Sequence, residues 1–269
     1  MRGASRASLA EAKERLAVAE GGQVPPDQIG DELFAVVRLL DSSPGVRRAL
    51  TDPTRSKAKA GLVRALLGDQ LAPATLDLVT GLVTARWSSQ RDLADAAEQL
   101  AVLAIAARAE AEGQLDDLED ELFRFGRVVA AEPGLRFALS DPYLPAERKN
   151  AMLGSLLDGR VIPLSFGLII EAANHPRGHS LDRSLEAYAR LVAERRERLV
   201  AVVRVAVGLT EQQRGRLAAA LSATYGREVY LSIVLDPAIM GGMSVQIGDE
   251  LIDASVAGRL AALRRRLAS

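Results

Sequence analysis

The chain has 269 residues, 48% of them hydrophobic and 26% charged, a composition typical of globular proteins and a length sufficient for two packed units. Its 34 lysines and arginines nearly balance 35 aspartates and glutamates, which argues against a broad nucleic-acid-binding face because such a face needs excess positive charge. The chain has no cysteine, which excludes disulfides and thiolate metal sites, and no run approaches the roughly 18 apolar residues of a membrane span.

Helical patterns run through the first part of the chain. After Asp27, apolar residues recur at i, i+3, i+4 and i+7, the spacing of a helix with one face in the core. A later stretch, residues 89–112, is long and rich in alanine, with Leu93, Ala97 and Leu100 on one face. The patterns predict helices at residues 8–20, 27–43, 45–50, 54–67, 74–86 and 89–112, with no strand between them.

The pattern then starts again. Residues 31–53 align with residues 120–142 at an offset of 89, and both copies carry Asp-Glu-Leu-Phe, Pro-Gly, Ala-Leu and Asp-Pro. The identical pairs are Asp31/Asp120, Glu32/Glu121, Leu33/Leu122, Phe34/Phe123, Arg38/Arg127, Pro44/Pro133, Gly45/Gly134, Arg47/Arg136, Ala49/Ala138, Leu50/Leu139, Asp52/Asp141 and Pro53/Pro142. So many identities indicate an internal duplication of a helical unit, and the two copies could stack as one rod or form two bundles.

The period of the apolar pattern changes after residue 198. Residues 199–207 are rich in valine, which favours a strand, and Thr210 with Gln213 forms a capping box that begins a helix. Alternating apolar residues predict another strand at residues 229–235. We therefore expect an α+β, mostly α protein, with duplicated helical bundle units at residues 1–112 and 113–198 and a small C-terminal α/β domain at residues 199–269.

The stretch from Leu235 to Val256 contains the densest pattern. After the paired glycines Gly241-Gly242, residues 243–247 alternate as a half-buried strand does. Gly248-Asp249 can turn the chain, because glycine accepts a positive φ, and residues 250–252 would return as a short partner strand. Asp253 or Ser255 can cap a final helix, which carries apolar residues on one face and arginines on the other.

This stretch closely resembles the signature of the delta subunit of bacterial F-type ATP synthases, the counterpart of the mitochondrial oligomycin-sensitivity-conferring protein. The residues of this chain that match the positions of the family's signature are Asp236, Pro237, Ile239, Gly241, Gly242, Val245, Ile247, Gly248, Asp249, Asp253, Ser255 and Val256. The second helical unit and the C-terminal domain together resemble a whole delta subunit, with Asn174 and Arg177 as the family often has them. The first unit is additional, which resembles the longer delta subunits of actinobacteria.

The resemblance implies a non-catalytic peripheral-stalk subunit, or stator, that takes part in ATP synthesis and proton transport without a cofactor. The helical part would bind the N-terminal segments of the alpha subunits in the catalytic head, and the C-terminal domain would bind the membrane-anchored b subunit. The protein would then lie at the cytoplasmic side of the cell membrane through its partners alone. The signature residues would have a structural role.

Chemical motifs are few. His175 and His179 are the only histidines, and Pro176 and Gly178 between them disrupt a helical metal-binding face. Gly241-Gly242 lacks the Lys-Ser/Thr of a phosphate loop, so backbone space for a bulge or crossing is the simpler interpretation. We expect neither a catalytic nor a metal site. The alternative to the stator is a helical adaptor whose C-terminal domain binds RNA through its arginine-rich final helix.

Overall fold

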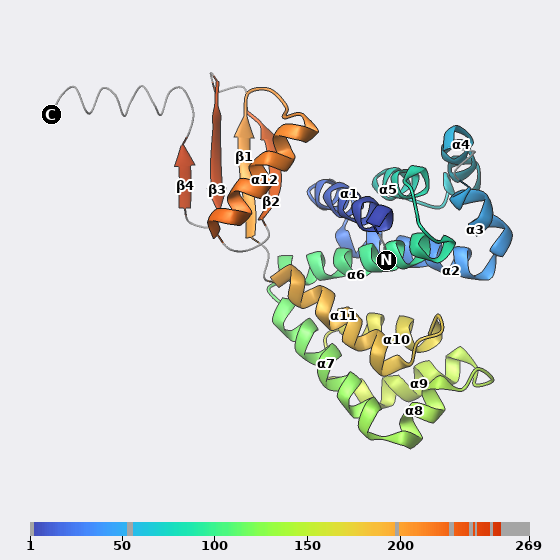
Figure 1. Ribbon diagram of the computed structural model, residues 1–269. Coiled ribbons are helices and arrows are strands. Elements are labelled where there is room, and N and C mark those ends of the chain that lie inside the picture. Colours follow the sequence, from blue (N-terminus) through green and yellow to red (C-terminus); the bar gives the residue numbers. More distant parts are fainter. Residues whose placement is uncertain are drawn as a thin grey trace. The chain divides into compact units, whose positions relative to one another are not determined.

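The computed structural model describes residues 3–52, 56–196, 199–225, 229–236, 239, 241–247 and 250–253. The chain divides into two compact units, Met1–Arg196 and Glu197–Ser269. The first is helical and the second contains a small sheet, which confirms the mostly α, α+β class (Figure 1).

The helical unit contains two sets of helices with matching lengths. In the first set, α2 (Pro26–Ser42) has 17 residues, α3 (Pro44–Thr51) has 8, and α4 (Ser56–Leu67) and α5 (Pro73–Thr84) have 12 each. In the second set, α7 (Leu115–Ala131), α8 (Pro133–Ser140), α9 (Ala146–Leu157) and α10 (Pro163–Asn174) repeat the lengths 17, 8, 12 and 12. The duplication inferred from the sequence therefore extends to the helices. The remaining helices are α1 (Gly3–Glu20), α6 (Gln90–Ala111) and α11 (Leu181–Arg196).

Proline residues mark several helix starts. Helices α2, α3, α5, α8 and α10 each have proline in the first turn, where the missing N–H has no intrahelical partner to lose. Most predicted helices agree with the structure to within a few residues. The first begins at Gly3 rather than at residue 8, and the fifth ends at Thr84 rather than at residue 86.

A partly buried polar contact repeats with the helices. The Glu32 carboxylate on α2 accepts a hydrogen bond of 3.0 Å from the backbone N–H of Ala72, the residue before α5. In the second set, the Glu121 carboxylate on α7 accepts one of 2.9 Å from the N–H of Ile162, the residue before α10. Each glutamate thereby supplies an acceptor for a free N–H at a helix start, and this explains why Glu32 and Glu121 are identical in the two copies.

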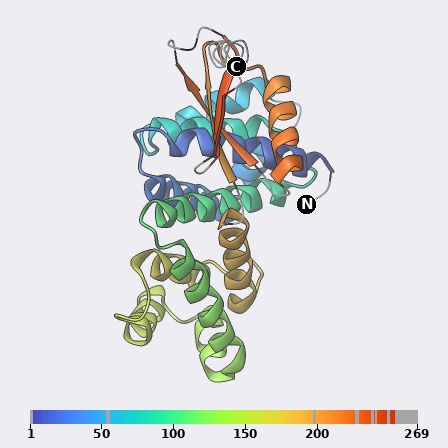
Figure 2. The ribbon, with the colours of Figure 1, turned by 90° about the vertical axis from the view of Figure 1, so that its left-hand side faces the viewer.

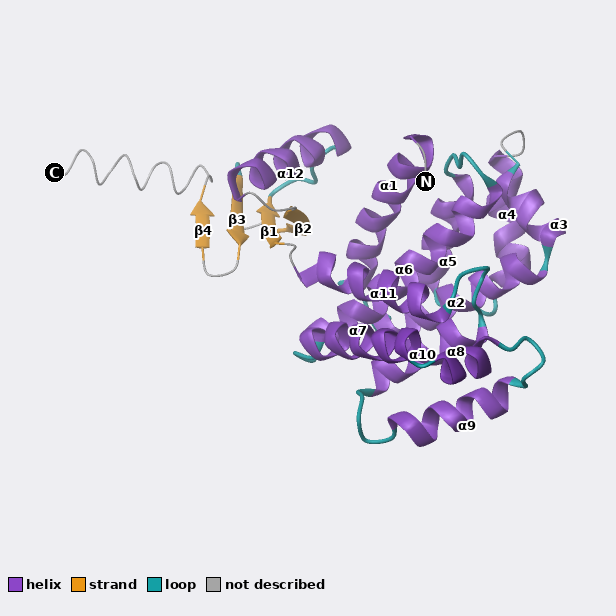
Figure 3. Cartoon of the chain, turned by 60° about the horizontal axis from the view of Figure 1, so that its bottom comes forward, coloured by secondary structure: helices purple, strands orange, loops and turns teal. Residues whose placement is uncertain are grey.

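Helix α6 lies at the centre of the unit (Figures 1 and 3). It packs along α2, and it also contacts α1, α3 and α5 on the side of the first set and α7, α10 and α11 on the side of the second. Its buried residues surround the helix: Leu93, Ala94, Ala96, Ala97, Leu100, Ala101, Val102, Leu103, Ala104, Ile105, Ala106, Ala107 and Ala109. A helix that is apolar on all sides belongs inside a core, and small alanines allow neighbours to approach from every direction. The sequence analysis identified only one of its faces.

One hydrophobic core runs through the whole helical unit. It extends without interruption from Ala12 on α1 to Val192 on α11. The two sets of helices therefore form one stacked body. Helix α11 packs along α7 as α6 packs along α2, so each set ends in a helix that closes it (Figure 2).

The C-terminal unit is a four-stranded sheet with one helix in the described residues. The strands are β1 (Leu199–Val205), β2 (Val229–Leu235), β3 (Met243–Ile247) and β4 (Glu250–Asp253), in the order β2-β1-β3-β4 (Figure 3). β1 pairs parallel with β2 and antiparallel with β3, and β3 pairs antiparallel with β4. The parallel pair requires a crossover, which α12 (Glu211–Tyr225) supplies.

The predictions for this unit agree closely with the structure. The bounds predicted for β2 and β3 are those observed, and the capping box forms, because the Gln213 side chain accepts a hydrogen bond of 2.9 Å from the N–H of Thr210. The first strand ends at Val205, two residues earlier than predicted. The predicted final helix lies outside the described residues.

Candidate functional site

The signature residues that the structure describes lie in or next to the sheet of the C-terminal unit. Asp236 follows β2, and its N–H donates a hydrogen bond of 2.9 Å to the carbonyl of Val205 at the end of β1. Gly241 and Gly242 have φ values of 146° and 82°, a backbone region that favours glycine, and they lead directly into β3. Ile247 at the end of β3 is buried in the core of the C-terminal unit.

The other signature positions divide into two groups. Asp253 ends β4 and pairs across the sheet with Ser244. Pro237, Gly248, Asp249 and Ser255 lie outside the described residues. The structural role expected of the signature as a whole therefore stays a prediction.

The two histidines lie in the loop between α10 and α11, as expected. They line an open pocket of about 470 Å³ in the helical unit, together with Asp41, Arg47, Arg91, Asp95, Asn174, Pro176 and Arg177. Among the residues that the structure describes, no three His, Cys, Asp or Glu side chains are grouped as metal ligands would be. Arginines and carboxylates in this pocket pair mainly with one another.

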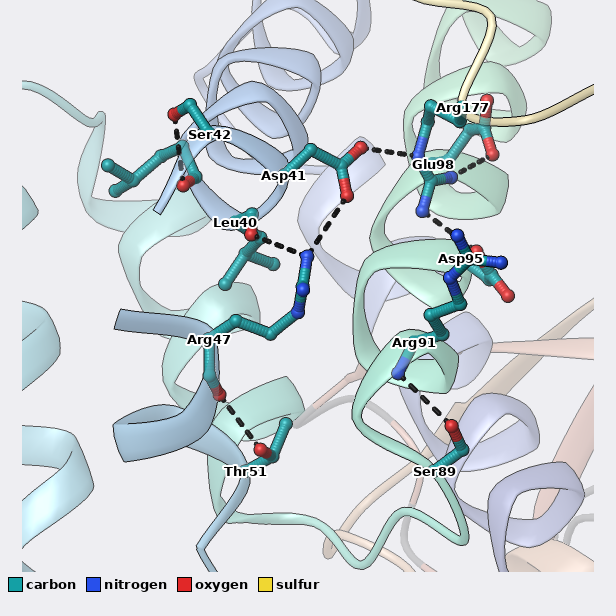
Figure 4. Close-up of polar contacts among 11 residues, drawn as sticks. Leu40, Asp41, Ser42, Arg47, Thr51, Ser89, Arg91, Asp95, Glu98 and Arg177 are labelled. Atoms are coloured by element: carbon teal, nitrogen blue, oxygen red, sulfur yellow. Dashed lines mark hydrogen bonds and ion pairs between the residues drawn. The ribbon is translucent and has the colours of Figure 1, made fainter. Parts of the chain in front are cut away.

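Arg177 is the centre of this polar cluster (Figure 4). Its guanidinium donates to Asp41 at the end of α2 at 2.6 Å, to Asp95 on α6 at 2.8 Å, and to Glu98 on α6. Its side chain is only 9% exposed. Arg177 thus connects the second set of helices to α2 and α6.

The backbone and the charges around Arg177 both suit this role. Its φ of 50° is in the left-handed region, and Gly178 follows with a φ of 81°, so the loop turns sharply before α11. Burial lowers the pKa of the Arg177 guanidinium, but Glu98, Asp41 and Asp95 raise it by more, so that the net direction is upward. The cluster holds a cation that is always charged, and the three carboxylates offset part of the desolvation cost of its burial.

Tyr188 on α11 extends the cluster into the core. Its hydroxyl donates a hydrogen bond of 2.7 Å to Glu98, and its ring lies 6.5 Å from the ring of Phe34 on α2. Burial and then Glu98 raise the pKa of Tyr188 well above its ordinary value. The tyrosine is therefore a neutral donor, and its aromatic ring is a contact between the two sets.

A second arginine connects the helices at the other end of α6. Arg195 near the end of α11 donates to Glu20 at the end of α1, with two contacts of 3.1 and 3.0 Å, and to Glu110 on α6 at 2.8 Å. Burial lowers the pKa of Arg195, and Glu20 and Glu110 raise it by more. The sequence analysis named Arg177 only as a family feature and did not single out Arg195, because their partners are between 79 and 175 residues away in sequence.

Exposed aromatic side chains gather in the second set of helices. Among the described residues they are Phe123, Phe137 and Tyr143, which are 51%, 77% and 91% exposed. Such side chains on the surface of a helical body indicate contact with another protein more often than chemistry. Among the described residues of the helical unit, the prominent features are partly buried ion-pair networks and exposed apolar side chains.

The comparisons with known proteins agree with this arrangement. A family model described as "ATP synthase delta (OSCP) subunit" matches residues 100–267, which begin within α6 and include the second set of helices and the C-terminal unit. Proteins named "ATP synthase subunit delta" match along the full chain. That of Streptomyces avermitilis is 48% identical over 99% of this chain and 98% of its own length, and that of Streptomyces griseus subsp. griseus is 47% identical over 100% of both.

A further relative and one solved structure are also similar to this chain. A protein named "ATP synthase subunit delta" from Kineococcus radiotolerans is 48% identical over 99% of this chain and 97% of its own length. A chain from the structure of the Toxoplasma gondii mitochondrial ATP synthase hexamer covers 62% of this chain at 17% identity, but its TM-score of 0.29 is too low to support an argument. Among the described residues, no helix has the combined length and apolar character needed to cross a membrane.

Proposed function

This chain belongs to the ATP synthase delta (OSCP) subunit family, whose members are non-catalytic peripheral-stalk subunits, and we propose that it joins the catalytic head to the membrane-anchored b subunit. In this proposal the helical unit binds the N-terminal segments of the alpha subunits, and the C-terminal unit binds the end of b. The protein then sits at the cytoplasmic side of the cell membrane through its partners. Identity of 46 to 48% over essentially the whole chain is the observation that carries the proposal.

The amphipathic helices of the helical unit support this role. Its helices present amphipathic faces, and partner helices bind such faces through residues spaced i, i+3, i+4 and i+7. A stator must stay attached while the rotor turns, so we expect interfaces that together exceed about 1,600 Å² and dissociate slowly. Exposed ion pairs would add only about 1 kcal/mol each, so apolar contacts have to supply most of the binding free energy.

Deletion of residues 199–269 tests the assignment of the two units. We expect the shortened chain to bind the alpha-subunit N-terminal segment as the full chain does and to lose the b subunit, as measured by co-purification with each partner. Circular dichroism serves as the control that the remaining helices are folded. Retention of b together with loss of the catalytic head would contradict the assignment.

The comparisons give no support to the RNA-binding adaptor. The relatives that match this chain over essentially its full length are named as ATP synthase subunits. A filter-binding measurement with single-stranded RNA at low salt would detect such an activity. We expect no salt-dependent retention.

A further inference from the structure

The hydrophobic core of the helical unit ends before helix α11 does. The last residue of α11 in that core is Val192, whereas the helix continues to Arg196. The last four carbonyls of a helix have no partner within the helix, and an end without apolar contacts opens easily. The final turn of α11 therefore depends on contacts other than apolar packing.

Ion pairs with two neighbouring helices support this turn. Arg196, the last residue of α11, pairs with Glu119 at 2.9 Å and with Asp116 at 3.5 Å, and both carboxylates lie near the start of α7. Two residues earlier, the Glu194 carboxylate lies 3.8 Å from the ammonium group of Lys13 on α1. The end of α11 is thus connected to the start of α7 and to α1.

Arg195 lies between these two residues and is the least exposed of the three. Its side chain is 15% exposed, and that of Glu20, the last residue of α1, is 12% exposed. Arg195 also pairs with Glu110, one residue before the end of α6. Successive residues of a helix point about 100° apart, so Glu194, Arg195 and Arg196 reach neighbours on different sides. Ion pairs therefore connect a single turn to α1, α6 and α7.

The helix dipole explains only part of this arrangement. An arginine in the last turn of a helix interacts favourably with the free carbonyls, and it needs no carboxylate on another helix to do so. Arg190, which is earlier on α11, pairs with Glu186 of the same helix, and both side chains are more than 60% exposed. The pairs at the final turn differ from this surface pair, because they join separate helices.

The chain leaves the helical unit at this turn. The C-terminal unit begins at Glu197, directly after Arg196, so the covalent connection between the two units is at this place. In the proposed function one unit binds the catalytic head and the other binds the b subunit, so force between these partners acts on the connection. An unsupported helix end would unwind under such a force, because each residue is held by a single hydrogen bond along the helix.

We propose that the final turn of α11 is a mechanical anchor, in which Arg195 and Arg196 transfer force from the C-terminal unit to α1, α6 and α7. This inference rests on the function proposed above. Because the ion pairs lie on different sides of the turn, the anchor resists a pull in more than one direction. Arg195 is its central residue, since its partners are on two helices and its side chain is more buried than that of Arg196.

Optical tweezers on the full chain test the anchor. The chain has no cysteine, so cysteines introduced at Glu197 and at Ala111, the exposed last residue of α6, attach the two handles at these positions alone. At constant force, Arg195→Ala should shorten the time before the end of α11 opens by about fivefold or more. Arg195→Lys keeps the charge but not the paired contacts with Glu20, so it should recover part of this time.

Arg190→Ala is the matched control. It removes an exposed pair within α11, and it should change the opening time by less than about twofold. Equal opening times in the original chain, Arg195→Ala and Arg190→Ala would overturn the anchor. So would an Arg195→Ala chain that unfolds at a lower denaturant concentration but keeps the original opening time under force, since Arg195 would then only stabilise the fold.

Co-purification of the original chain with the alpha and b subunits separates this proposal from the function on which it rests. A chain that binds neither partner contradicts the proposed function, whatever the opening times are. A chain that binds both partners, with opening times that do not depend on Arg195, overturns the anchor alone.

Discussion

At the scale of single residues, Arg177 is the residue whose removal should disturb the helical unit most. Replacement by alanine leaves Asp41, Asp95 and Glu98 close together without their cation. Two of these carboxylates are more than a third exposed, so water moderates the penalty, and we expect a loss of about 1–3 kcal/mol in the free energy of unfolding. Denaturant unfolding of the full chain, followed by circular dichroism, measures it.

The matched control for Arg177 is Arg190→Ala. Arg190 forms an exposed i, i+4 pair with Glu186 on α11, and its side chain is 67% exposed. Its removal should change the free energy of unfolding by less than about 0.5 kcal/mol. An equal loss in the two variants would mean that the network around Arg177 adds nothing beyond a surface ion pair.

Phe34 and Phe123 also show where inference from sequence ends. The two copies share Asp-Glu-Leu-Phe, and a local pattern assigns both phenylalanines the same environment. The difference between the buried Phe34 and the exposed Phe123 arises because the second set of helices stacks on the first, and no further helix of the described helical unit stacks on the second. Contacts between residues so far apart in sequence leave no local signal, and the same holds for the partners of Arg177 and Arg195.

At the scale of elements, the close approach of α2 to α6 depends on Gly30. A Cβ at this position would lie 2.6 Å from Cγ1 of Ile105 and 3.1 Å from the backbone oxygen of Ala101. Gly30→Ala should therefore separate the two helices and lower the free energy of unfolding by about 1–3 kcal/mol. Thermal unfolding of the full chain measures the change.

Gly61 on α4 is the matched control for Gly30→Ala, because a Cβ at this position has free space. Apart from its two chain neighbours and the nearby backbone of α4 itself, no heavy atom lies within 4 Å of a Cβ placed there. Gly61→Ala should raise the free energy of unfolding by up to about 1 kcal/mol, because alanine loses less backbone entropy than glycine in a helix. If both substitutions destabilised the protein equally, the cost at Gly30 could not be assigned to its contact with α6.

Helices and strands with a clear apolar period were predicted well from the sequence. Helix α6 shows where such a prediction fails. The alternation of large apolar residues gave the observed bounds of β2 and β3, because in each strand one face is more apolar than the other. The alanine-rich α6 has no such contrast, since its small residues are buried on every side. A pattern of period 3.6 identifies the buried face of a helix that packs on one side. It does not reveal that a helix is buried on every side between two sets of neighbours.

At the scale of the whole molecule, the position of α6 predicts which fragments fold. A fragment of residues 89–196 keeps α6 with the second set, and it should remain helical and unfold cooperatively, at a lower temperature than the full chain. A fragment of residues 113–196 loses α6 and with it much of the core around α7 and α11, so it should not unfold cooperatively. Circular dichroism during heating distinguishes the two, and a cooperative transition in the shorter fragment would contradict the central role of α6.

The sharing of α6 between the two sets also has a mechanical consequence. A loop between two separate bundles would be a hinge, and a hinge yields when the rotor exerts torque on the peripheral stalk. Here the connection is a helix of 22 residues, about 33 Å long, and bending there would have to distort its hydrogen bonds and break the arginine contacts near both of its ends. The added helices are thus joined to the second set by a continuous helix and not by a flexible loop.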